Sequence, residues 1–147
     1  MKKSNYLATR KVRLTFDDIM ERTKIHLEYL LKATSKSILW ASISTPSGWE
    51  GWFADRVSLK DKIATFYWGK TEHREAEIIG IRAFSYIRLR WLDDENECEY
   101  FEMRMTNNEL TNDVVLEIID FADADEANDL CELWEAQVDT LRRTCGF

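Results

Sequence analysis

Proline, glycine and cysteine are scarce in this sequence, and long apolar runs are missing. One Pro and five Gly among 147 residues exclude collagen-like chains and linkers. Cys98, Cys131 and Cys145 have no CxxC spacing, so they indicate neither a zinc site nor a disulfide framework. No stretch approaches the roughly 18 apolar residues of a membrane span, and no signal-peptide segment follows the basic start. We therefore expect a soluble, cytoplasmic protein.

Positive charge is concentrated in one short segment. Residues 1–13 contain five basic side chains and no acidic one, in a chain of net charge −7. Subtracting +5 from −7 leaves −12 for the remainder. This disfavours specific nucleic-acid binding, because an acidic surface repels phosphates. The basic segment is interpreted as a solvated tail, with contact to RNA or an anionic membrane surface as the alternative.

Hydrophobic and aromatic residues are plentiful. They make up 45% and 12% of the chain, with six Trp, seven Phe and five Tyr. This composition excludes wholesale disorder and supports one domain with a packed core. We place the domain at residues 23–147. A basic, loosely docked extension over residues 1–22 precedes it, because that segment has few apolar positions to bury.

Much of the domain alternates apolar and polar residues with period two, which is typical of half-buried strands. In the first such segment, Lys24–Lys32, Ile25 and Leu27 face one side while His26 and Glu28 face the other. Turn residues separate the further strands that the pattern predicts, at residues 56–59, 63–68, 72–81, 85–91, 99–106 and 114–121.

Three segments follow the helical period instead. Short helices are predicted over residues 35–44 and 47–54, the second beginning with capping-box spacing at Ser47–Glu50. A long C-terminal helix is predicted from a second capping box, Asp123–Glu126, to a stop at Gly146. Its apolar residues cluster on one arc, so it must lie across a sheet. The order predicts an α+β fold in which a curved antiparallel sheet wraps the C-terminal helix.

Four short stretches carry a family resemblance. They read ILWASISTP with GWFAD at residues 38–46 and 51–55, ATFYWG at 64–69, IRLRW at 87–91 and LWEAQ at 133–137. Together they resemble the START-like (SRPBCC) superfamily, which has the helix-grip fold. Within it, the chain is similar to small bacterial START-like proteins related to the C-terminal domain of the ATPase activator of the ninety-kilodalton heat-shock chaperone. The resemblance implies the helix-grip fold but no single function, because proteins with this fold include lipid carriers, cyclases and co-chaperone modules.

Residues that carry enzyme chemistry are sparse. His26 and His73 are the only histidines, and neither has a partner at a spacing that suggests a nucleophile system. An enzyme of the cyclase type, with Glu72, His73 or Asp120 at a cavity mouth, is therefore the least favoured hypothesis. The acidic residues between 120 and 129 lack the glycine of a calcium loop and are explained by helix capping. We expect neither a metal nor a cofactor.

Charged strand residues are assigned to the outer surface. Arg88 and Arg90 should form cross-strand ion pairs with the strand that carries Glu102 and Arg104. The acidic hairpin at residues 93–99 is interpreted as a solvated turn, with recognition of a basic partner as the alternative.

Large aromatic side chains fall on the inward faces. Core packing explains each ring singly, but a curved sheet and one helix rarely close tightly over so many flat rings, so we predict an apolar cavity between them. A polar residue on the helix stripe, Gln137, is predicted either to make a structural hydrogen bond or to orient a ligand. The predicted lining residues are Trp40, Trp52, Phe53, Phe66, Trp68, Ile78, Leu89, Trp91, Phe101, Met103, Leu116, Leu130, Trp134, Gln137 and Leu141.

The favoured hypothesis for function is non-enzymatic binding of a hydrophobic small molecule or lipid in this cavity. The alternative is a protein-interaction module similar to the chaperone activator, in which the acidic surface and residues Trp49–Asp55 would contact a partner such as a chaperone. The expected oligomeric state is a monomer or a homodimer.

Overall fold

A computed structural model describes residues 22–32, 35–111 and 113–146. Most of the predicted N-terminal extension, residues 1–21, lies outside the described residues. The strands of the described part are β1 (Arg22–Leu31), β2 (Arg56–Lys60), β3 (Ile63–Trp68), β4 (Glu72–Arg82), β5 (Tyr86–Trp91), β6 (Phe101–Asn107) and β7 (Val114–Asp123). The helices are α3 (Lys36–Ser44), α4 (Pro46–Glu50) and α5 (Ala127–Cys145).

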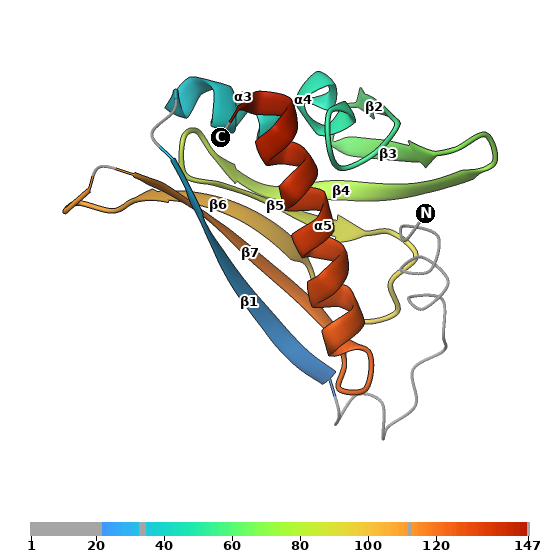
Figure 1. Ribbon diagram of the computed structural model, residues 1–147. Coiled ribbons are helices and arrows are strands. Elements are labelled where there is room, and N and C mark those ends of the chain that lie inside the picture. Colours follow the sequence, from blue (N-terminus) through green and yellow to red (C-terminus); the bar gives the residue numbers. More distant parts are fainter. Residues whose placement is uncertain (1–21, 33–34, 112, 147) are drawn as a thin grey trace.

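The seven strands form one antiparallel sheet in the order β1-β7-β6-β5-β4-β3-β2. The sheet curves around α5, which crosses one face of it, while α3 and α4 lie together near one end of α5 (Figure 1). Alternate residues of β3, β5 and β7 are buried, as period-two patterning requires. This arrangement confirms the predicted fold. None of the helices in the described residues combines the length and apolar character that a membrane span requires.

The junction between α3 and α4 differs from the prediction. Thr45 ends α3 and caps α4, because its hydroxyl accepts a hydrogen bond from Gly48 N at 3.1 Å. The predicted capping box at Ser47–Glu50 was wrong, since the Glu50 carboxylate accepts from Val57 N at 2.9 Å instead. The helix ends at Glu50, so residues 51–55 belong to neither a helix nor a strand.

An ion pair joins the start of β1 to the loop between β5 and β6. β1 begins at Arg22, two residues before the predicted start, and the Arg22 guanidinium pairs with Glu99 and, at 2.8 Å, with Asp123. Glu99, where the sequence predicted this strand to begin, lies in the loop, and β6 begins at Phe101. The predicted capping box of the C-terminal helix was also wrong, since the N-cap is Glu126 and has no side-chain cap.

Of the two arginines predicted to pair with β6, Arg88 does so, whereas Arg90 lies 3.8 Å from Glu77 on β4 instead. Glu102 accepts hydrogen bonds from Nε of Arg88 at 2.8 Å and of Arg104 at 3.1 Å. The Glu102 side chain is nevertheless only 1% exposed. The two guanidinium groups lie over the rings of Tyr100 and Tyr86 and cover the carboxylate. This part of the outer surface is therefore packed rather than wet.

Candidate functional site

The predicted lining residues lie in one interior cluster between the sheet and α5. Thirteen of the fifteen are buried, and Trp40 and Ile78 are partly buried against the same core. The aromatic rings within this cluster contact one another directly. A cavity between the sheet and α5 stays a prediction.

Phe53 lies at the centre of this cluster. Its ring stacks on Phe101 at 5.9 Å and on Trp134 at 5.6 Å between ring centroids. It also meets the edges of Phe66 at 5.1 Å and Trp68 at 6.3 Å. One ring therefore joins α5 to β3 and β6, although it is carried by the irregular segment after α4.

Three indole N–H groups of the interior donate to backbone carbonyls. Trp49 donates to the Ile43 carbonyl and Trp52 to the Ser42 carbonyl, each at 2.9 Å. Trp68 donates to the Phe53 carbonyl at 2.9 Å. A buried indole that donates a hydrogen bond is held in one orientation, so these rings form a rigid wall around Phe53.

Gln137 and Asp120 are polar side chains that enter this apolar interior. Gln137 is buried on the sheet-facing stripe of α5, as predicted, and its Nε2 donates to the Phe53 carbonyl at a long 3.4 Å. Asp120 is fully buried and accepts from Trp134 Nε1 at 3.0 Å.

Burial, together with the nearby Asp120 and Glu135, raises the pKa of the Cys131 thiol. That thiol therefore stays protonated and is a poor nucleophile.

Arg74 is a buried residue that the sequence analysis missed. It lies on the inner face of β4, with its guanidinium 4.1 Å from the Trp91 ring centroid. Its Nε donates to Asp93 at 2.9 Å. The alternation in β4 places Arg74 on the same face as Ala76 and Ile78, which was the signal available in the sequence.

An apolar patch is exposed near α3 and the β4–β5 turn. Ile38 is 49% exposed, Ile81 54% and Phe84 55%, and the Phe84 ring stacks on Trp40 at 6.1 Å. Figure 1 shows this turn beneath α3. The backbone of Phe84 has a φ of 58°, which is unusual for a bulky residue. The name apolar patch is used below for the Trp40–Phe84 contact together with the exposed side chains of Ile38 on α3 and Ile81 at the end of β4.

The predicted catalytic and docking residues are not brought together. His73 is exposed on β4 beside the Tyr67 ring, whereas Asp120 is buried on β7, three strands away in the sheet order. In the segment Trp49–Asp55, both tryptophans and Phe53 are buried. The rings of this segment therefore offer no surface to a partner, and its exposed residues are Glu50, Gly51 and Asp55.

Comparison with known proteins agrees with this architecture. The model of the START-like superfamily domain matches residues 19–147. BfR322 from Bacteroides fragilis is 66% identical, with a TM-score of 0.63 over 87% of this chain and 94% of that one. No curated protein sequence matches.

Two more distant structures share the fold alone. The Aha1 dimer from Colwellia psychrerythraea is 12% identical, with a TM-score of 0.55 over 67% of this chain and 75% of that one. DynU16, from the dynemicin biosynthetic locus, is 14% identical, with a TM-score of 0.65 over 82% of this chain. This match spans only 46% of the DynU16 chain.

Proposed function

Because the chain belongs to the START-like superfamily, we propose that it binds a small hydrophobic molecule between the sheet and α5 and releases it unchanged. The proposal is carried by the position of Phe53, whose ring stacks on Phe101 and on Trp134 in a three-ring cluster, since those two rings lie 6.4 Å from each other. A flat apolar molecule in that place would make the same two stacking contacts. The ligand class is therefore planar and mainly apolar.

The irregular segment that carries Phe53 makes such an exchange feasible. Residues 51–55 belong to no strand or helix, and four of their five backbone hydrogen bonds run to Gly48 or Trp49 of α4. Only the bond from Asp55 N to the Tyr67 carbonyl joins them to the sheet, so moving the segment away from the sheet together with the end of α4 breaks one backbone hydrogen bond. The indole of Trp134 donates to an acceptor outside this segment and would stay in place, whereas the Trp68 indole would lose its bond to the Phe53 carbonyl. Gln137 would then present its amide to the ligand, as one of the few polar groups that ligand sites use for orientation.

Co-purified ligand tests this function. Untagged protein from its host should show bound mass in native mass spectrometry, and organic extraction should release an apolar molecule that competes with the dye ANS. Phe53→Ala should increase ANS binding, because it opens stacking space, at a cost of about 3–5 kcal/mol in unfolding free energy. Phe53→Leu is the milder variant if the alanine protein does not fold.

The matched control is Ile79→Ala, which shortens an exposed side chain on β4 and should leave ANS binding unchanged. Protein without bound mass, combined with no ANS binding by the wild type or either Phe53 variant, would overturn the proposal.

A second candidate function, protein interaction similar to that of the chaperone activator, is favoured by the apolar patch. Exposed apolar patches mark interaction sites more often than ordinary surface. Pull-down of the host's ninety-kilodalton chaperone, with and without nucleotide, and a measurement of its ATP turnover test this function. Phe84→Ser should abolish any stimulation, whereas Gln137→Leu should not affect it. Absence of binding in both nucleotide states excludes this candidate.

A further inference from the structure

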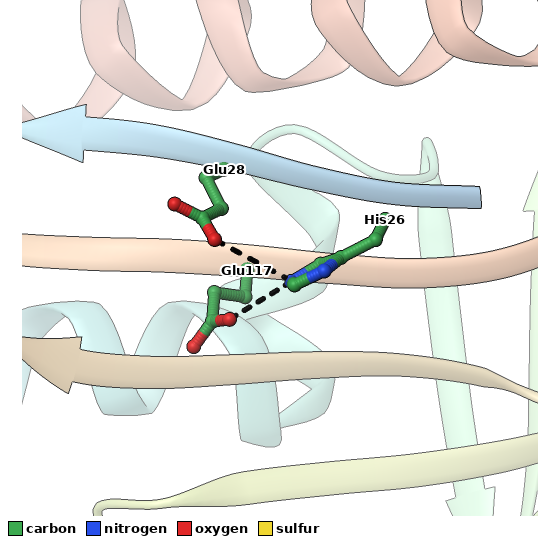
Figure 2. Close-up of side chains that lie close together, drawn as sticks. All are labelled: His26, Glu28 and Glu117. Atoms are coloured by element: carbon green, nitrogen blue, oxygen red, sulfur yellow. Dashed lines mark hydrogen bonds and ion pairs between the residues drawn. The ribbon is translucent and has the colours of Figure 1, made fainter.

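The outer face of the sheet carries a histidine and two carboxylates that converge. His26 and Glu28 are two residues apart on β1 and share that face, and Glu117 of β7 stands directly opposite Glu28. Figure 2 shows the three side chains pointing toward one another. His26 Nε2 lies 2.9 Å from Glu117 Oε1 and 3.7 Å from Glu28 Oε1.

The charges of this cluster favour a cation at its centre. Two carboxylates placed directly opposite on neighbouring strands repel each other. Arg104 stands opposite Glu117 on β6, but its Nε is bound to Glu102. Lys24 lies two residues before His26 on the same strand face. A divalent ion between the three side chains would remove the repulsion directly.

The distances suit tetrahedral coordination. Zinc binds imidazole nitrogen and carboxylate oxygen at about 2.0–2.2 Å, which places two tetrahedral donors about 3.3–3.5 Å apart. The observed separations of 2.9 and 3.7 Å bracket that value, and one donor atom of each residue lies within 4.8 Å of the others. Small side-chain rotations would therefore complete the site on a rigid pair of strands.

We propose that His26, Glu28 and Glu117 bind a divalent cation of the zinc type, with water in the fourth position. Imidazole suits Zn²⁺, Ni²⁺ and Cu²⁺, whereas Mg²⁺ and Ca²⁺ prefer oxygen donors alone. The side chains are 49%, 63% and 18% exposed, so the ion reaches them without any opening of the fold. The acidic group Asp123, Asp125 and Glu126 carries no such proposal, since it has no histidine and Asp123 pairs with Arg22.

Calorimetric titration of the untagged full chain with Zn²⁺ tests the site. We expect one binding event, weakened at least about tenfold in His26→Ala and in Glu117→Gln, because even residues that only support metal ligands contribute that much. His73→Ala is the matched control, as the other histidine is also exposed. Cys98→Ser controls for zinc binding at the exposed thiol. Both controls should bind Zn²⁺ like the wild type.

Side-chain NMR of the two histidines locates the ion. Zn²⁺ should shift the His26 ring signals and leave those of His73 in place. Wild-type protein that binds no Zn²⁺, or His26→Ala protein that binds it equally well, would show that the cluster is only an ion pair. Binding of ANS should be the same with and without Zn²⁺, so failure of this site and failure of the interior site are separate outcomes.

Discussion

At the scale of single residues, Gln137 distinguishes a structural role from a ligand-binding role. Its amide donates to the Phe53 carbonyl at 3.4 Å, while the same carbonyl accepts a shorter bond of 2.9 Å from Trp68. Removing the Gln137 amide therefore leaves that buried carbonyl with a partner. We therefore expect the amide to be dispensable for the fold.

We predict that Gln137→Leu keeps the unfolding free energy within about 1 kcal/mol of the wild type while lowering ligand retention. Denaturant unfolding and the amount of extracted ligand measure the two effects. A destabilised protein with unchanged ligand content would show that Gln137 stabilises the fold and does not bind the ligand.

Trp134→Phe is the matched comparison for this variant. It removes the 3.0 Å indole bond to the fully buried Asp120 carboxylate. A buried carboxylate that loses a donor costs about 1–3 kcal/mol or more. Trp134→Phe should therefore destabilise the protein more than Gln137→Leu, as the same denaturant unfolding would show.

Burial of large apolar residues was predictable from the sequence, whereas the places of polar residues were less so. Alternation in β7 puts Asp120 on the face of Leu116 and Ile118, and alternation in β4 does the same for Arg74. The inward position of both residues could be predicted from this alternation. The partners that stabilise their buried charges could not, because those partners lie far along the chain. Asp120 is bound by Trp134 of α5, and Arg74 by Asp93 and the ring of Trp91.

At the scale of elements, the strands and α5 were predictable because their burial pattern is regular along the sequence. Both predicted capping boxes failed because the helices begin elsewhere, with N-caps at Thr45 and Glu126, while one residue of each box has a partner outside it. Glu50 bonds to Val57 in β2, and Asp123 pairs with Arg22 in β1. Local spacing carries no information about such contacts.

The packing of α4 on α3 depends on the missing side chain of Gly48. A Cβ at this position would lie 1.9 Å from the Ala41 carbonyl oxygen and 2.7 Å from Ser42 Cα, both backbone atoms. Gly48→Ala must therefore separate the two helices and disturb the segment that carries Phe53. We predict a loss of about 3 kcal/mol or more in unfolding free energy, because overpacking against backbone relaxes poorly.

Gly51→Ala provides the control in the same segment. Its backbone is right-handed helical, with φ −73° and ψ −23°, and an added Cβ would find its nearest atoms at 3.5 Å. We expect this substitution to be neutral or to stabilise by a few tenths of a kcal/mol up to about 1 kcal/mol. Equal thermal midpoints for the two alanine variants would contradict the proposed close approach of α4 to α3.

At the scale of the whole molecule, the boundary of the folded unit depends on one arginine. The composition break placed it between residues 22 and 23, yet β1 includes Arg22. The guanidinium of Arg22 joins the first strand to the end of β7 and to Glu99, which is buried in the β5–β6 loop. Breaking a buried ion pair from one side costs about 3–5 kcal/mol.

We predict that residues 1–21 can be removed without unfolding the rest, provided that Arg22 is kept. A chain starting with Met followed by Arg22 should melt within about 10 °C of the full chain, a limit that corresponds to a little over 2 kcal/mol for a domain of this size. The same truncated chain with Arg22→Ala should lose clearly more, because Glu99 and Asp123 then lose a shared cation. A larger drop from the truncation than from Arg22→Ala in the full chain would show that residues 1–21 contribute to the fold, and the domain boundary would have to be moved toward the N-terminus.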